Sequence, residues 1–211
     1  MSMSSFFTDI VTSEATLREL IGTPSELVLQ KQLTALDTHC QTFIAYSPFL
    51  LIGTMNATGG CDVSPRGDMP GFVQVVDETT LVIPERPGNR RIDTLRNILQ
   101  TPHVGLLFLI PGRGEMLRVN GRACLTREAT FLERAMVQGK RPLIAIGVEI
   151  EECFIHCARA IKRSQLWEQR EHTEHAEWPS LGRMLLDQTR LTDMTVQELD
   201  TSIEKDYKHL Y

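Results

Sequence analysis

The pattern of hydrophobic and polar positions changes near residue 49, from one typical of helices to one typical of strands. Upstream of it, an amphipathic segment runs from Ser13 to Gly22, and Pro24-Ser25-Glu26 offers the start of a second helix. Asp37 suits the N-cap of a third helix, because its carboxylate can accept a hydrogen bond from an unpaired N–H group of the first turn. We therefore expect residues 1–48 to form a helical extension.

Downstream, short apolar runs alternate with clusters of turn-forming residues, which predicts β-strands at close spacing. The run at 104–112 is apolar throughout and is typical of a central strand buried on both faces. The expected strands cover residues 49–55, 61–64, 71–77, 80–84, 104–112, 116–125 and 142–156. Short connections between most of these strands favour an antiparallel sheet or barrel.

Two helices are expected among the strands, one at 88–100 and one near 126–138. The first has apolar residues three and four apart on one face, namely Ile92, Leu95, Ile98 and Leu99. Six or seven strands with helices at both ends predict a mainly β (α+β) fold, a small closed barrel over residues 49–167. Residues 168–211 have a charged, helical pattern without enough apolar residues for a core of their own, so we expect this tail to pack on the barrel or on a dimer partner.

The composition is that of an ordinary soluble globular protein. Hydrophobic residues make up 42% of the 211 residues and charged residues 23%, which argues against disorder. The formal net charge of −5 gives no general attraction to nucleic acid or anionic membranes, so neither is expected as a partner. The sequence shows no secretion signal and no apolar run near the roughly 20 residues that span a bilayer. Five cysteines without Cys-x-x-Cys spacing indicate reduced thiols and a cytoplasmic location.

The strongest local signal for a ligand is the segment 83–95, IPERPGNRRIDTL. After a strand and a glycine-containing turn, a helix is expected to begin near Asn89, with Arg90 and Arg91 in its first turn. The free N–H groups of a helix start suit a phosphate, and guanidinium groups bind phosphate in a bidentate manner. Two cations there disfavour an isolated helix by about 0.3–1 kcal/mol each, so the pair predicts a bound anion. The structural alternative is solvation of the arginines, or ion pairs with the nearby carboxylates of Glu85 and Asp93.

The segment 61–72, CDVSPRGDMPGF, adds a further positive charge. Arg66 stands between Pro65, whose φ is restricted, and Gly67, which has no side chain. A flat ligand could therefore lie against this backbone. Alone the segment is compatible with a surface loop; beside the strand that leads to the arginine pair, it predicts one wall of a binding site.

Several of these motifs occur together, in the order found in one protein family. The segments CDVSPRGDMPGFV, TLVIPERPGNRRIDTLRNIL, VGLLFLIPG and LRVNGRA resemble the FMN-binding split barrels of the pyridoxamine 5'-phosphate oxidase-like family, in a branch distinct from the true vitamin B6 oxidases. The resemblance extends from about Phe49 to Trp167. It implies a flavoprotein, an oxidoreductase acting on a small molecule, and a homodimer with FMN at the subunit interface.

The resemblance also implies where the cofactor contacts lie. The strand that ends at Arg66 would run along the isoalloxazine ring, where a positive charge near N1–C2 stabilises the anionic reduced flavin. The strand end at Ile83 and Pro84 would contribute backbone contacts, and the basic pair Arg90 and Arg91 would hold the 5'-phosphate. Residues near the C-terminal end of the barrel would reach the flavin from the partner subunit. The implied contact residues are Val63, Ser64, Pro65, Arg66, Ile83, Pro84, Asn89, Arg90, Arg91, Arg163, Ser164 and Trp167.

Two departures from the family pattern concern the substrate. The vitamin B6 oxidases carry a glutamine where Met116 stands here, and their Arg-x-His motif is absent from the end of this chain, KDYKHLY, although His156 and Arg159 lie in the general region. The resemblance therefore does not assign pyridoxamine phosphate as the substrate, and no catalytic residue is predicted. Two alternatives stay open: a flavin carrier or sensor without turnover, and a split barrel that uses deazaflavin or haem.

Other chemistry-bearing residues favour plainer interpretations. Cys153, His156 and Cys157 are close in sequence, but zinc normally needs four ligands and no second cluster is evident, so no metal site is predicted. His172 and His175 could share one helix face in the charged tail. Cys61 adjoins the predicted flavin wall without a neighbour that would make it a low-pKa nucleophile.

Overall fold

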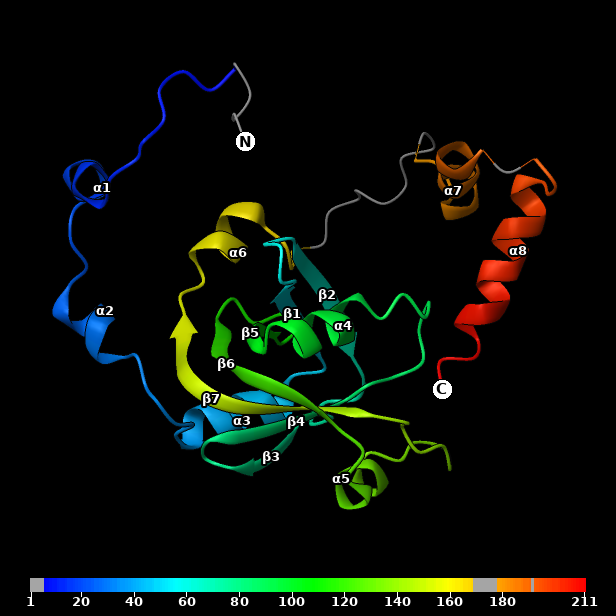
Figure 1. Cartoon of the computed structure of the whole chain (residues 1–211), viewed down its shortest axis with the longest axis horizontal. Helices are drawn as coiled ribbons and strands as arrows, with labels where there is room; N and C mark the ends of the chain where they lie inside the picture. Colours follow the sequence, from blue (N-terminus) through cyan, green and yellow to red (C-terminus); the bar gives the residue numbers. More distant parts are fainter. Residues whose placement is uncertain (1–5, 169–177, 191) are drawn as a thin grey trace.

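The computed structural model describes residues 6–168, 178–190 and 192–211. Within them, one seven-stranded sheet is flanked by helices from both ends of the chain (Figure 1). The elements are α1 (Glu14–Ile21), α2 (Glu26–Gln30), α3 (Thr38–Tyr46), β1 (Phe49–Met55), β2 (Cys61–Gly67), β3 (Gln74–Asp77), β4 (Thr80–Pro84), α4 (Asp93–Gln100), β5 (His103–Leu109), β6 (Met116–Thr126), α5 (Ala129–Arg134), β7 (Ala145–His156), α6 (Arg159–Ser164), α7 (Leu181–Thr189) and α8 (Val196–Tyr207).

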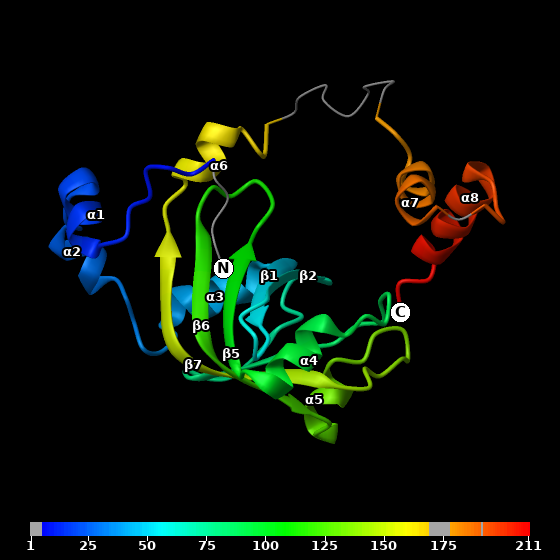
Figure 2. The same ribbon diagram turned by 45° about the horizontal axis from the view of Figure 1, so that its top comes forward.

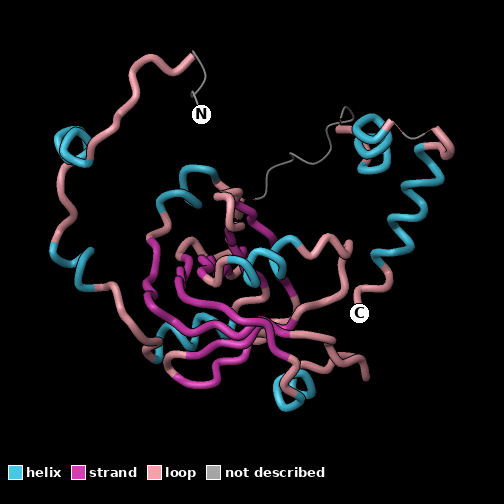
Figure 3. Tube along the Cα trace, viewed as in Figure 1, coloured by secondary structure: helices cyan, strands magenta, loops and turns pink. Residues whose placement is uncertain are grey.

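The strands follow the order β2-β1-β5-β6-β7-β4-β3, and each pairs with its neighbours in antiparallel fashion. The β6–β7 register shifts between Asn120 and Gly121, and such bulges bend and twist a strand pair. The strands curl around a common interior, as the magenta trace in Figure 3 shows. This confirms the predicted α+β fold with an antiparallel split barrel, and it leaves β2 and β3 as the two edges of the sheet.

One apolar core fills the interior of the curled sheet. Strand alternation supplies most of it, because every second side chain of a strand faces inward. The largest fully buried side chains are Phe108, Ile44, Leu50, Ile52, Leu81, Ile83, Leu106, Leu117 and Ile146. Helix α3 adds Cys40 and Ile44, and Asp37 caps its start as predicted, by accepting a hydrogen bond of 2.8 Å from the Cys40 N–H group. That bond lowers the pKa of the Asp37 carboxyl.

Several predicted elements prove shorter or differently buried. The expected strand at 71–77 is confined to β3, and the expected helix near 126–138 to α5. The prediction that 104–112 is buried on both faces is wrong: β5 alternates between buried and half-buried or exposed residues, because only one of its faces points into the core. The helical character expected over 13–46 is divided among α1, α2 and α3, and the first two bury no residue.

The tail contains the helices expected from its pattern. In Figure 2, α7 and α8 lie beside each other and apart from the strands. The N–H group of Gly182 donates to Asp200 at 2.7 Å, and a Cβ at residue 182 would displace that carboxylate, so the small glycine favours this helix contact. His172 and His175 lie outside the described residues.

Candidate functional site

A cavity of about 660 Å³ lies between the end of β2 and the segment that runs from β4 into α4. This volume falls in the range of roughly 300–1,000 Å³ that is usual for small-molecule sites. Most of the residues that the sequence singled out as ligand contacts line it. They are Ser64, Pro65, Arg66, Pro84, Asn89, Arg90 and Arg91.

Strand β2 forms one wall of the cavity and extends to Gly67, three residues beyond the predicted strand. The strand tolerates Pro65, which lacks an N–H group, because β2 is an edge of the sheet. Alternation turns Asp62, Ser64 and Arg66 toward the cavity, whereas Val63 is 66% exposed and does not line it. Val63 therefore lies outside the cavity lining, unlike the other predicted contacts on β2.

The cavity lies where the sheet is not continuous. We expected β2 beside the strand that leads to the arginine pair, but β2 and β4 are not neighbours in the sheet. Two ion pairs of opposite polarity connect them instead. Arg66 Nε donates to Glu85 at 2.9 Å, and Arg86 Nε donates to Asp68 at 2.6 Å. We call these four residues, Arg66, Asp68, Glu85 and Arg86, the seam.

The seam is sheltered from solvent. The Asp68 side chain is only 2% exposed, and those of Arg66 and Arg86 are 14% and 15% exposed. Burial opposes ionisation of Asp68, but hydrogen bonds from Tyr211, from the Met69 N–H group and from Arg86 outweigh it and lower the pKa of this carboxyl. The structure therefore favours a permanently charged Asp68 at neutral pH.

The loop before α4 forms the opposite wall, and it differs from the prediction. The helix begins at Asp93 and not near Asn89, so the arginine pair precedes its first turn. The Asn89 side chain accepts the Arg91 N–H group at 3.0 Å, and both Arg90 (φ 63°) and Ile92 (φ 56°) adopt left-handed conformations that prevent an earlier start. A left-handed β-branched residue is strained, and such strain is frequent at ligand sites.

The charges around this loop are unevenly neutralised. Arg91 Nε donates to Asp93 at 2.8 Å, so Arg91 forms the ion pair with a nearby carboxylate that the sequence offered as an alternative to anion binding. Glu85 pairs with Arg66 and not with either arginine of the loop. Within the described residues, Arg90 makes no ion pair or side-chain hydrogen bond. Arg90 thus brings an unbalanced positive charge to the cavity.

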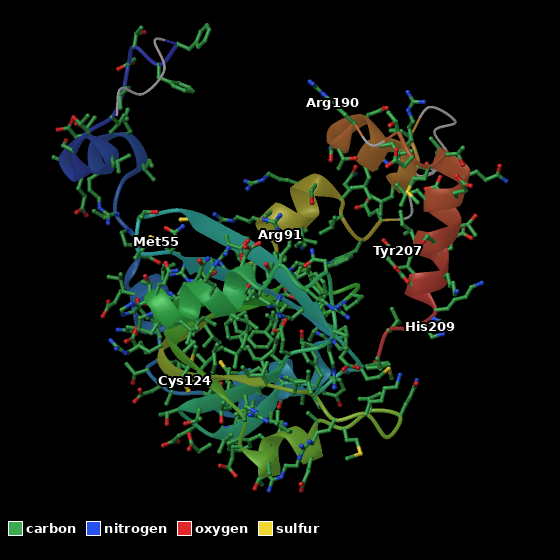
Figure 4. All side chains as sticks on the ribbon, turned by 45° about the vertical axis from the view of Figure 1, so that its right-hand side comes forward. Met55, Arg91, Cys124, Arg190, Tyr207 and His209 are labelled. Carbon is green, nitrogen blue, oxygen red and sulfur yellow. The ribbon has the colours of Figure 1, made fainter. Side chains whose placement is uncertain are left out.

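The start of α4 adds a second attraction for an anion. No side chain caps this helix at Ile92, and the residues of its first turn line the cavity. Free N–H groups and the partial positive charge of a helix start favour a negative group there. Arg91, which is labelled in Figure 4, belongs to the loop that lines the cavity.

Hydrogen bonds hold α4 against the sheet. Asp62 accepts bonds from the hydroxyl groups of Ser64 at 2.9 Å and Thr94 at 3.1 Å. Deeper in the protein, the buried Asn97 donates to Thr54 at 3.0 Å and ties the helix to β1. The cavity therefore combines a cationic end with a wall of a carboxylate and hydroxyl groups, an arrangement that suits a phosphate joined to a polar chain.

The other predicted contacts lie elsewhere. Ile83 is fully buried in the core. Arg163 and Ser164 belong to α6, and Ser164 donates to the Ile161 carbonyl group at 3.1 Å. Trp167 follows that helix and donates from Nε1 to the Arg113 carbonyl group at 2.6 Å. None of these four lines the cavity of its own chain, and a contact from a partner subunit stays a prediction for the last three.

Sequence reasoning missed several residues of the site. Asp62 could have been found, because strand alternation places it on the face of Ser64 and Arg66. Asp68 and Arg86 could not, since their pairing joins positions far apart in sequence and depends on how the sheet curls.

Two further points concern the described part of the chain. No group of three His, Cys, Asp or Glu residues there is arranged to hold a metal ion, and no helix is long and apolar enough to cross a membrane. Of Cys153, His156 and Cys157, which are close in sequence, Cys153 is buried in the core. Burial and the charges of Arg118 and Lys31 lower the pKa of His156.

Comparison with solved structures finds several similar chains at low sequence identity. HupZ of Group A Streptococcus is 18% identical with a TM-score of 0.47, over 57% of this chain and 93% of that one. HutZ, a haem storage protein from Vibrio cholerae, is 14% identical with a TM-score of 0.39, over 58% and 94% of the two chains. An FAD-binding protein from Mesorhizobium loti is 15% identical with a TM-score of 0.41, over 57% and 94%. At these scores the likenesses support no argument about a ligand.

The comparison with family models is more direct. No curated protein matches the chain. The family model described as pyridoxamine 5'-phosphate oxidase matches residues 36–157, more than half of the 211 residues, and the match includes every strand and the whole cavity lining. The chain therefore belongs to the pyridoxamine 5'-phosphate oxidase family.

Proposed function

We propose that this protein is an FMN-dependent oxidoreductase that binds FMN non-covalently in the cavity between β2 and α4. The observation that carries the proposal is the unpaired Arg90 beside an uncapped helix start. A dianionic phosphate there satisfies both the guanidinium group and the free N–H groups of the first turn.

The remaining lining residues suit the rest of an FMN molecule. Arg91 is 73% exposed and can exchange Asp93 for the phosphate at little cost. Asp62 and the hydroxyl group of Ser64 lie where a polyhydroxyl chain needs hydrogen-bond partners. Arg66 brings a positive charge to the β2 wall, balanced by Glu85. The flavin, when bound, supplies the redox chemistry, while these residues bind and orient it.

The described residues of the cavity favour a flavin over haem. Haem iron is held in proteins by histidine, cysteine, methionine or tyrosine, and none of these residue types is among the described residues that line the cavity. Deazaflavin would fit the same anion-binding features, so the binding experiment must distinguish it from FMN.

The proposal includes a homodimer. Arg163, Ser164 and Trp167 are exposed and remote from the cavity of their own chain. In a dimer with the flavin at the interface, they would complete the site of the partner subunit. A mass of two chains in solution supports this arrangement, and a monomer that retains full FMN affinity contradicts it.

Titration with FMN and with riboflavin, which lacks the phosphate, tests the site. We expect the protein to bind FMN more tightly than riboflavin. Arg90→Ala should weaken FMN binding by about 1.5–3 kcal/mol, the usual contribution of hydrogen bonds to charged groups, and leave riboflavin binding unchanged. Arg122→Ala, an exposed arginine of β6 outside the cavity lining, is the matched control.

The opposite results are equally clear. Equal affinity for FMN and riboflavin, or an equal loss for both in Arg90→Ala, would contradict the phosphate assignment. Tighter binding of deazaflavin or haem than of FMN would replace the proposed cofactor with that ligand.

A further inference from the structure

The tail reaches the barrel through its last residue. The Tyr211 hydroxyl group donates to Asp68 Oδ1 at 2.6 Å, and the Tyr211 carbonyl oxygen accepts from Lys140 Nζ at 2.6 Å. The Arg86 guanidinium group lies over the Tyr211 ring, with 5.5 Å between Cζ and the ring centroid. These contacts engage the hydroxyl group, the ring and the backbone of Tyr211, and together they hold its side chain in one orientation.

Two of these three contacts, those with Asp68 and Arg86, end at the seam. Asp68 receives three donors: the Tyr211 hydroxyl group, the Met69 N–H group at 2.7 Å and Arg86 Nε. Arg86 also donates to the Ala135 carbonyl group at 2.8 Å and lines the cavity. Tyr211 therefore joins the ion pair that holds the end of β2 against the segment after β4.

The geometry couples this contact to the cavity walls. Asp68 lies two residues after Arg66, and Arg86 directly follows Glu85. Arg66 and Glu85 form the other ion pair of the seam, and both line the cavity. Because the Asp68 side chain is 2% exposed, water cannot readily replace a lost donor, so loss of the Tyr211 hydroxyl group weakens the hydrogen bonding that holds this carboxylate against Arg86.

We propose that Tyr211 is a positioning residue for the cavity. By completing the hydrogen bonds of Asp68, it holds the two walls together and slows the release of the bound cofactor, a role that rests on the proposed function. Helices α7 and α8 bring it there: they pack on each other, and in the described part of the chain the hydrogen bonds that join residues 178–211 to the barrel come from Tyr211.

Tyr211→Phe is the sharpest variant, because it removes one hydroxyl group and keeps the ring under Arg86. Tyr207→Phe is the matched control, since Tyr207 lies on α8, is 64% exposed and makes no side-chain hydrogen bond to the seam. In the cofactor-free full chain, Tyr211→Phe should speed amide hydrogen exchange about threefold to tenfold in residues 61–68 and 84–92. Exchange in β7 should stay unchanged, and Tyr207→Phe should match the parent protein throughout.

The second measurement is the rate of FMN release, followed by the recovery of flavin fluorescence after dilution. We expect release to be about threefold to tenfold faster in Tyr211→Phe. In an Asp68→Ala background the same substitution should have no further effect, because its partner is absent.

The outcomes separate this inference from the proposed function. Faster exchange at the seam in a protein that binds no FMN would support the positioning of the walls and refute the proposed cofactor. Tight FMN binding with unchanged exchange and unchanged release in Tyr211→Phe would overturn the role of Tyr211. Faster exchange throughout the barrel would also overturn it, because the hydroxyl group would then support the whole fold and not the seam.

Discussion

The sheet and the seam enclose the same interior by different means. From β2 through β1, β5, β6 and β7 to β4, backbone hydrogen bonds join each strand to the next. Between β2 and the segment after β4, four side chains carry the connection. The cavity lies on the side held by side chains, so its shape depends on charges that a ligand, a neighbouring residue or pH can alter, whereas the sheet is insensitive to them.

The largest expected loss of stability comes from a substitution in the sheet. A Cβ on Gly121, at the bulge between β6 and β7, would overlap the carbonyl oxygen of Glu149. Gly121→Ala should therefore lower the free energy of unfolding by about 3 kcal/mol, as overpacking against backbone does. Chemical denaturation measures this loss.

Gly88→Ala is the control for that substitution. Gly88 lies in the loop at the cavity, and an added Cβ meets nothing within 4 Å. Its free energy of unfolding should stay within about 0.5 kcal/mol of the parent value. Similar losses in the two alanine variants would mean that the backbone at the bulge can shift to admit a Cβ on residue 121.

A smaller effect is expected from opening the seam. Glu85→Ala leaves the largely buried Arg66 without its partner and should lower the free energy of unfolding by about 1–2 kcal/mol. Combining it with Arg66→Ala should cost less than the sum of the single changes, with a coupling of about 1 kcal/mol. Strict additivity in this double-mutant cycle would show that the ion pair does not connect the two walls.

The sequence predicted the sheet much better than the seam. Strands β1, β4, β6 and β7 were predicted from short apolar runs separated by turn-forming residues, which are local patterns. The segments around Arg66 and Arg90 were each predicted to contact a ligand, and the structure brings them to one cavity. Whether they bind FMN stays a prediction.

The parts that sequence could not supply are non-local or strained. The start of α4 was misplaced because Asn89 captures the Arg91 N–H group and Ile92 turns left-handed, which no propensity favours. The partners of Arg66 and Arg86 depend on a sheet that curls until the end of β2 comes close to the segment after β4. The contact of Tyr211 with Asp68 joins residues 143 positions apart.

The smallest expected effect is a pH dependence at the seam. Hydrogen bonding to Asp68 raises the pKa of Tyr211, while hydrogen bonds that outweigh burial lower the pKa of Asp68. Both groups face Arg86, and Lys140 adjoins Tyr211. The lowered pKa of Asp68 stabilises the fold above its ordinary value of 3.8, and this contribution is lost as pH falls through the folded-state pKa.

The sign is opposite for Tyr211. Its raised pKa stabilises the fold below the ordinary value of 10.0, and this contribution is lost as pH rises through the folded-state pKa. The parent protein should therefore be more stable than Tyr211→Phe by about 1 kcal/mol across the interval between those two ordinary values, with a smaller difference outside it. A difference that grows in acid or in base would contradict the hydrogen bond.

The most direct test of the account is the visible spectrum of the purified protein, together with the mass of any chromophore released by denaturation. We predict a flavin spectrum, bleached by reductant and restored by an acceptor, and a released molecule with the mass of FMN. A colourless protein that also fails to take up added FMN would contradict the central claim that the cavity between β2 and α4 is a flavin site.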